Sequence, residues 1–318
     1  MKYYDFSAKR IVEGQNLTDA TSSESLFIVC SASEVPRLSE VFGFDERTVV
    51  ECTDFEKNVC CASFEGYDFV SAVILRDNDY EPDEVDFYAA PNYCVLVLPD
   101  RPSEGGASLA EALESLAEQL INLDDGENTY QHSKRIYYMF WQGILAQYTD
   151  LLAHLETEIE VLSEALLHGK RNDPFESVDN IRHRCYKVKK YLRALYYLSA
   201  QVISDCNGLF DEKYERLYNG VETRLRMLFE FADGLYTLCG ELFEVIQSRM
   251  NMRTEDSMNK LTVIMLFFAP LTVITGIYGM NFQYMPELHW RAGYPFALSI
   301  MAIVLVILWI IVKKKKWL

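Results

Sequence analysis

Cysteine and histidine side chains are the groups best able to bind metals or act as nucleophiles, and this 318-residue chain has eight and five of them. The cysteines form no Cys-x-x-Cys pair and no zinc-ribbon spacing, and His183 with Cys185 is too small a set for a metal site. The chain has no P-loop, Gly-x-Ser-x-Gly, His-Glu-x-x-His or kinase motif. We therefore expect no enzyme activity, no cofactor, and reduced cysteines as in the cytosol.

A second set of residues forms a stripe along one predicted helix. Its members step by three or four residues: Met258, Leu261, Met265, Ala269, Thr272, Gly276 and Gly279. This spacing puts them on one helical face. The first members are bulky and apolar, which suits a gate that excludes water, and the last are small, which suits close approach of helices. The stripe therefore predicts the lining of a pore or, alternatively, an ordinary helix–helix interface.

Two apolar runs identify the elements that carry this stripe. Leu261–Tyr278 and Pro295–Val312 each contain 18 residues and no charge. A bilayer core requires about 20 such residues, whereas about 10–14 are typical of a buried helix in a soluble protein. Both runs are therefore predicted to cross a membrane, and Pro270 is tolerated because neighbouring helices can satisfy the freed carbonyl.

Basic residues that flank these runs predict the orientation. Arg249, Arg253 and Lys260 precede the first run, Lys313–Lys316 follow the second, and the connection contains only Arg291. By the positive-inside rule, both termini are cytoplasmic and the loop over residues 279–294 faces outward. We expect a multi-pass protein of the cell (inner) membrane, in contact with its lipids.

The front of the chain is strongly acidic. Residues 1–130 contain 8 Lys or Arg and 27 Asp or Glu, a net charge of −19, and the remainder has 22 and 20, a net of +2. An acidic surface argues against nucleic acid as a partner, because nucleic acids require a basic face. Such a surface is able to attract cations.

Short β-rich runs alternate with turn residues over the first 100 residues. We expect strands at Ser25–Cys30, Asn58–Ser63, Tyr67–Leu75, Glu84–Tyr88 and Tyr93–Leu98. Turns are expected at Asp77–Asp79 and Glu81–Asp83. A helix is expected over Ser108–Ile121, with Ser108 as its N-cap.

Helical periodicity dominates the rest of the chain. Helices are expected over Ile136–Leu167 and Val178–Ile203, and basic residues of the second should pair with acidic residues of the first. A third, Asp211–Tyr278, would have 68 residues and a length on the order of 100 Å. A helix of this length requires partners, so we expect it to pack against copies of itself.

The fold class is therefore α+β. A mixed α/β cytosolic domain (1–130) is followed by a cytosolic helical region with a stalk helix (131–260), which continues into a two-span membrane domain (261–318).

The end of the first membrane run resembles the signature of CorA-type magnesium transporters. The residues that carry this resemblance are Tyr278-Gly279-Met280-Asn281-Phe282. Further similarity covers Pro270–Thr272, Tyr284–Leu288, Gly293–Pro295 and the terminal Lys313–Leu318. The resemblance spans about residues 244–318.

This resemblance implies a funnel-shaped homopentamer in which the long helix lines a central pore. Gly279, Met280 and Asn281 would form the selectivity filter, with a ring of Asn281 carboxamides at the outer mouth. Mg²⁺ loses its waters reluctantly, and neutral amide oxygens accept hydrogen bonds from those waters. Glu255 stands where many relatives have Asn, and Glu244 matches an acidic position deeper in the pore.

The implied function is Mg²⁺ uptake through a channel that cytosolic divalent cations regulate, with Mg²⁺ as transported and regulatory ion. One alternative is the same fold acting on Zn²⁺, Co²⁺ or Ni²⁺, in either direction. Another is a membrane-tethered cytosolic sensor. No cluster of soft ligands of the kind that zinc prefers is found in the sequence.

Overall fold

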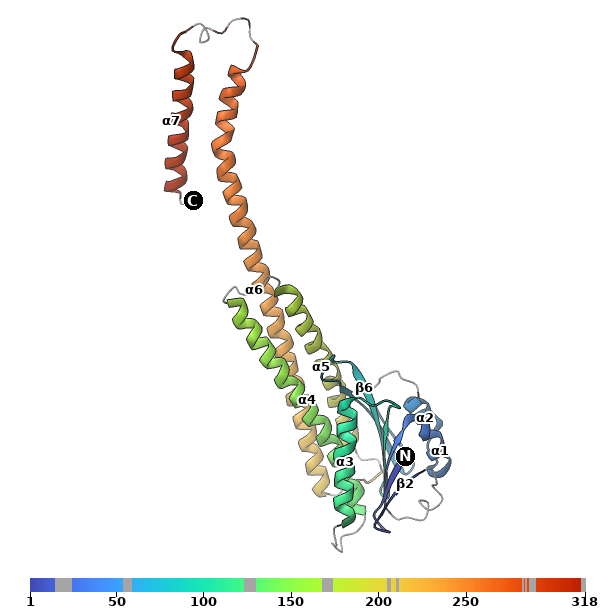
Figure 1. The fold of residues 1–318 in the computed structure, drawn as a ribbon. Helices are drawn as coiled ribbons and strands as arrows, with labels where there is room; N and C mark the ends of the chain where they lie inside the picture. Colours follow the sequence, from blue (N-terminus) through green and yellow to red (C-terminus); the bar gives the residue numbers. More distant parts are fainter. Residues whose placement is uncertain are drawn as a thin grey trace. The chain divides into compact units, whose positions relative to one another are not determined.

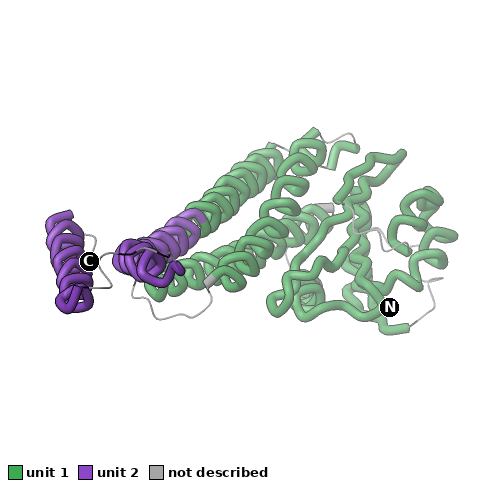
Figure 2. The backbone as a smooth tube through the Cα atoms, turned by 90° about the horizontal axis from the view of Figure 1, so that it is seen from above, with its two compact units in different colours: residues 1–243 green, residues 244–318 purple. Residues whose placement is uncertain are grey.

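The computed structural model describes residues 1–14, 25–53, 59–122, 130–167, 174–204, 207–209, 212–281, 283, 285 and 290–315. The chain divides into two compact units, residues 1–243 and 244–318 (Figure 2). The elements of the first unit begin with β1 (Lys2–Asp5), β2 (Arg10–Glu13), β3 (Leu26–Ser31), α1 (Val35–Phe42), α2 (Glu46–Thr53), β4 (Cys60–Phe64), β5 (Tyr67–Leu75), β6 (Pro82–Ala89) and β7 (Tyr93–Leu98). They continue with α3 (Glu104–Asn122), α4 (Tyr130–Leu167) and α5 (Pro174–Ile203). Helix α6 (Glu212–Tyr278) begins in the first unit and continues into the second, which also contains α7 (Gly293–Lys314).

The strands form one sheet in the order β2-β1-β3-β7-β6-β5-β4. The β3–β7 pair is parallel and the other pairs are antiparallel. All nine residues of β5 are buried, which explains why its sequence is a continuous run with few polar residues. The predicted bounds of Tyr67–Leu75 and Tyr93–Leu98 are confirmed.

Helices cover both faces of this sheet (Figure 1). On the face with α1 and α2, the Phe44 ring stacks on that of Tyr88 with centroids 4.0 Å apart. On the other face, Phe140 of α4 stacks on Phe87 at 4.7 Å, and the Tyr148 hydroxyl donates to the carbonyl of Val73 at 2.8 Å. These buried aromatic side chains join the helices to the sheet.

Basic residues of α5 make the ion pairs that join it to its neighbours. Arg184 donates to Glu158 of α4 at 2.9 Å, as predicted. Lys187 instead pairs with Glu81, next to β6, at 2.6 Å, and Lys189 pairs with Asp233 of α6. Among the described residues, the prediction that this basic face pairs with α4 is therefore correct for Arg184 only.

Several predicted boundaries are wrong. Helices α4 and α5 begin at Tyr130 and Pro174, six and four residues before the predicted Ile136 and Val178. Pro82 and Asp83 were expected in a turn, but β6 begins at Pro82, which the sheet tolerates because proline can occupy the first position of a strand. Helix α3 begins at Glu104 and not after Ser108. The Ser103 hydroxyl accepts the N–H of Gly106 at 3.2 Å and thus acts as the N-terminal cap.

Four short elements were not predicted: β1, β2, α1 and α2. Each contains eight residues or fewer, which gives too little periodicity for identification from sequence.

The long C-terminal helix of the sequence prediction is confirmed, because α6 is a single helix of 67 residues with Pro270 inside it. Within the most apolar 18-residue window, only 6% of the residues of α6 and 11% of those of α7 are buried. Core helices of soluble proteins are mostly buried, so this exposure favours two membrane-spanning helices.

Candidate functional site

Every member of the predicted stripe is exposed to solvent in the single chain. This holds for the bulky side chains Met258, Leu261 and Met265 and for the small residues that follow, Ala269, Thr272, Gly276 and Gly279. All of them lie on α6 within residues 244–318. No other part of the described chain covers this face.

The residues of α6 that are covered lie on the opposite side of the helix. They are Val263, Leu266, Phe267, Pro270, Leu271 and Ile274, all buried or half-buried. A matching face runs along α7: Ala297, Met301, Val304, Leu305, Leu308 and Val312. At 3.6 residues per turn, the stripe is directed away from the covered face of α6. The stripe is therefore not an interface between helices of the same chain, and pore lining or an interface between copies of the chain are the alternatives that follow from its exposure.

The stripe ends where α6 ends, at a short turn over Gly279 and Met280. The N–H of Gly279 donates to the carbonyl of Thr275 at 2.9 Å, and that of Met280 donates to the carbonyl of Ile277 at 3.2 Å. Gly279 does not have a positive φ, unlike the usual glycine at a helix C-terminus. A Cβ there would lie 3.2 Å from the Thr275 carbonyl oxygen, a tight contact with the last turn of the helix.

Asn281 follows this turn and is exposed, as is Met280. A carboxamide offers one acceptor oxygen and two N–H donors without net charge. One such side chain cannot enclose an ion, but copies of it around an axis could present a ring of oxygens to a hydrated cation.

The two acidic positions assigned from sequence also lie on exposed α6. Glu255 is three residues before Met258, and Glu244 is three helical turns before Glu255. This spacing puts both carboxylates on the same side of the helix as the stripe. In the described parts of the chain, no three His, Cys, Asp or Glu side chains come together as a metal-binding group.

One pair of cysteines differs from the other thiols: a hydrogen bond between Cys185 and Cys239 lowers the pKa of Cys239 and raises that of Cys185. The seven described cysteines are free thiols, and Cys206 is outside the described residues. Burial raises the pKa of Cys60 and of Cys94 to about 12, so these thiols stay protonated at neutral pH.

A buried polar row in the sheet was missed by the sequence reasoning. The register aligns five residues across β3, β7, β6, β5 and β4: Cys30, Val97, Asp86, Ser71 and Cys60. Asp86 is only 4% exposed, and its Oδ1 has no hydrogen-bond partner among the described residues. Burial raises the pKa of Asp86 to about 7, although hydrogen bonds with Ser71 and Cys52 act in the opposite direction. The available signal was the alternation that gives Asp86 and Tyr88 the same face of β6.

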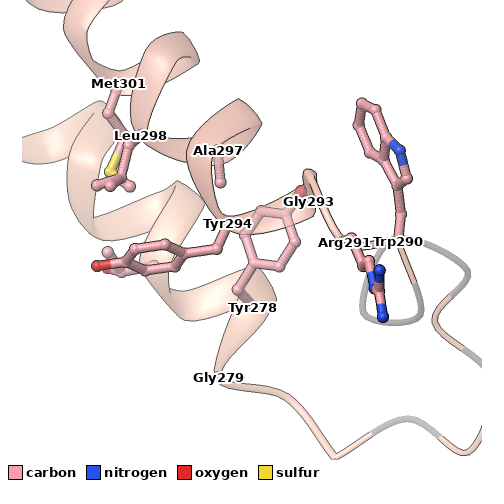
Figure 3. Close-up of a pocket in the computed structure, with 10 residues that line it drawn as sticks. Tyr278, Gly279, Trp290, Arg291, Gly293, Tyr294, Ala297, Leu298 and Met301 are labelled. Atoms are coloured by element: carbon pink, nitrogen blue, oxygen red, sulfur yellow. The ribbon is translucent and has the colours of Figure 1, made fainter.

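A cavity of about 420 Å³ lies beside the C-terminal end of α6 within the second unit (Figure 3). It is lined by Thr275, Tyr278, Gly279, Trp290, Arg291, Gly293, Tyr294, Ala297, Leu298 and Met301. The sequence reasoning used Arg291 only for topology and did not identify this cavity.

Comparison with known proteins gives consistent results. The family model for CorA-like Mg²⁺ transporter proteins matches residues 26–314. The cobalt/magnesium transport protein CorA of Thermotoga maritima is 25% identical over 288 residues, which cover 89% of this chain and 80% of that protein.

Two solved structures have the same fold. The complete CorA magnesium transporter of Methanocaldococcus jannaschii matches with a TM-score of 0.81 and 18% identity, over 100% of this chain and 98% of that one. The full-length CmaX protein matches with a TM-score of 0.75 and 17% identity, over 99% and 97%. Because the family model spans nearly the whole chain, including both apolar helices and the end of α6, this chain belongs to the CorA-like Mg²⁺ transporter family.

Proposed function

We propose that the chain conducts Mg²⁺ across the cell membrane as a homopentameric channel whose outer entrance is a ring of Asn281 side chains. The observation that carries this proposal is the exposed stripe of α6, which is directed away from the covered face and ends at Asn281. Relatives named as magnesium or cobalt/magnesium transport proteins support the same ion class.

Self-association is required because two helices cannot enclose a pore. Along α6, exposed apolar side chains recur every seventh residue at Phe231, Leu238, Val245 and Met252. A heptad repeat is typical of a helix that packs against other helices. At Gly276 an added Cβ would meet nothing within 4 Å, so no contact within the chain requires glycine there. Close approach of another copy supplies a reason for this small residue.

The pathway would act on a hydrated ion in three stages. Asn281 oxygens accept hydrogen bonds from the water shell of Mg²⁺, whereas a carboxylate ring would hold the ion too firmly for rapid passage. Gly279 and Met280 set the turn that presents this amide. Thr272 offers a hydroxyl further along the stripe, and Met265, Leu261 and Met258 form an apolar constriction. Glu255 and Glu244 then raise the local cation concentration at the inner side.

Regulation would come from the acidic front of the chain. A net charge of −19 over residues 1–130 repels the same region of another copy unless cations neutralise it. Bound cytosolic Mg²⁺ would hold the copies together in a closed state, and its loss would release them. This arrangement requires both termini to be cytoplasmic, as the flanking Lys and Arg residues predict.

Ion flux into proteoliposomes tests the function directly. The full chain should carry Mg²⁺ inward down its gradient, and parallel assays with Co²⁺ and Zn²⁺ give the ion order. Vesicles without protein are the control for leakage. A correctly inserted protein that moves none of these ions would contradict the channel and favour a membrane-tethered sensor.

A further inference from the structure

The cavity beside the C-terminal end of α6 combines features that the proposed pore does not use. Its lining includes a single charged side chain, Arg291, which is the only Lys or Arg between Leu261 and Val312. Within the described residues, Arg291 makes no ion pair. A cation beside the entrance of a cation channel is unfavourable unless an anion neutralises it. An anionic ligand in the cavity would neutralise the positive charge of Arg291.

The rest of the lining divides into an aromatic part and an apolar part. Trp290 lies beside Arg291 and Tyr278 lies next to them, whereas the ring of Tyr294 is directed toward the side of Leu298 and Met301, which lie further along α7 (Figure 3). Tyrosine and tryptophan are enriched where a membrane meets water, because one part of each ring is apolar and another is polar. The cavity thus changes from polar to apolar along α7, from the loop toward the interior of the span.

We propose that this cavity binds an anionic glycerophospholipid of the leaflet on the loop side, with its phosphate on Arg291 and an acyl chain along Leu298 and Met301. A guanidinium group matches a phosphate with two parallel hydrogen bonds. The cavity of about 420 Å³ has room for part of one lipid, not for a folded partner. An anionic lipid brings a phosphate with net negative charge to this depth, next to an apolar chain, whereas phosphatidylcholine carries its own cation beside the phosphate.

The inference requires α6 and α7 to cross a membrane, but it does not depend on which ion is transported. Its failure would therefore leave the proposed Mg²⁺ channel intact. Conversely, a protein without flux could still bind the lipid.

Trp290 provides a built-in reporter, since it lines the cavity and is 54% exposed. The full-length protein is placed in phosphatidylcholine bilayers that contain phosphatidylglycerol, with bromine on the acyl chains of one lipid at a time. The difference in tryptophan quenching between the wild type and Trp290→Phe isolates the signal of Trp290. We expect brominated phosphatidylglycerol to associate about fivefold more strongly than brominated phosphatidylcholine, the ratio expected for one basic residue near anionic lipid.

Three variants identify the group responsible. Arg291→Gln should reduce the preference to about one, and Arg291→Lys should retain most of it because the charge is kept. Lys313→Gln is the matched control: Lys313 lies over the Trp309 ring at the other end of α7 and does not line the cavity, so the preference should not change.

Four results would overturn the proposal. The first is a wild type that shows no preference for phosphatidylglycerol over phosphatidylcholine. The second is an Arg291→Gln variant that keeps the preference. Quenching of Trp290 by neither lipid would mean that another copy of the chain fills the cavity. Relief of quenching by soluble glycerol phosphate would mean that the site takes a free phosphate and not a lipid.

Discussion

Replacing Asp86 by Asn should abolish a pH dependence of stability in the first unit. The Asp86 carboxyl is buried in β6, and burial raises its pKa from an ordinary value of 3.8 to about 7. The folded state therefore keeps the proton up to about pH 7, whereas the unfolded state loses it near pH 4. The resulting stabilisation is complete below pH 4, falls as the pH rises, and is lost once the pH has passed through 7.

The size of the effect follows from the difference between the two pKa values. A difference of about 3 units corresponds to about 4 kcal/mol, at about 1.4 kcal/mol per unit. Between pH 5 and pH 8 the expected loss is about 2.5 kcal/mol, or roughly a 70-fold change in an opening equilibrium. Asp86→Asn keeps the shape of the side chain and removes the ionisation. The stability of this variant should therefore lack the pH dependence that the Asp86 carboxyl causes.

Hydrogen–deuterium exchange in the full-length protein measures this opening locally. Peptides from α2 and β6 report on it, because the Cys52 Sγ of α2 lies 3.4 Å from the Tyr88 hydroxyl of β6. After correction for the intrinsic exchange rate, wild-type protection should fall between pH 5 and pH 8, and that of Asp86→Asn should not. Glu65→Gln, an exposed acid in the turn between β4 and β5, should behave as the wild type. Equal slopes in the wild type and Asp86→Asn would refute the reasoning.

Three further predictions concern assembly and topology. Leu238→Asp places a charge on the exposed heptad face and should lower the detergent-corrected mass from that of a pentamer toward that of a monomer, whereas a pentameric variant would show that this face is not an interface. Gly276→Val should leave the helicity of the chain unchanged by circular dichroism, since a Cβ at this position meets nothing within 4 Å, but reduce Mg²⁺ flux at least tenfold; full flux would show that Gly276 does not line the pore. A cysteine introduced by Leu318→Cys should react with a membrane-impermeant reagent only after the cells are opened. Labelling of intact cells would show that the C-terminus lies outside and that the predicted topology is wrong.

The sequence predicted the long elements of the fold well because their patterns are long. Buried strands such as Tyr67–Leu75 appear as continuous apolar runs, and α6 has no proline until Pro270 and few glycines for its length. Helices α1 and α2 have eight residues each, and their packing depends on Phe44 and Tyr88, which are distant in sequence. Contacts of that kind are not visible in local periodicity.

Part of the candidate site could also be predicted from the pattern of residues in the sequence. Helical spacing identified the stripe from Met258 to Gly279, but only the structure distinguishes an uncovered face from an intrachain interface. Gly279 ends the helix without a positive φ, and a Cβ there would lie 3.2 Å from the Thr275 carbonyl oxygen, which helical spacing does not reveal. The cavity at Arg291 combines α6 and α7 residues that are about 20 positions apart, so no local pattern predicts it.

Mg²⁺ uptake by Asn281→Ala tests the central claim most directly. The substitution removes the amide oxygen and leaves α6 unchanged, since Asn281 follows the end of the helix. Loss of a hydrogen bond to a charged partner costs about 1.5–3 kcal/mol, so uptake into proteoliposomes should fall at least tenfold. Gln283→Ala, which removes an exposed amide two residues further on, should transport as the wild type does. If Asn281→Ala forms the same assembly as the wild type and takes up Mg²⁺ at the wild-type rate, Asn281 does not form the entrance of the pore.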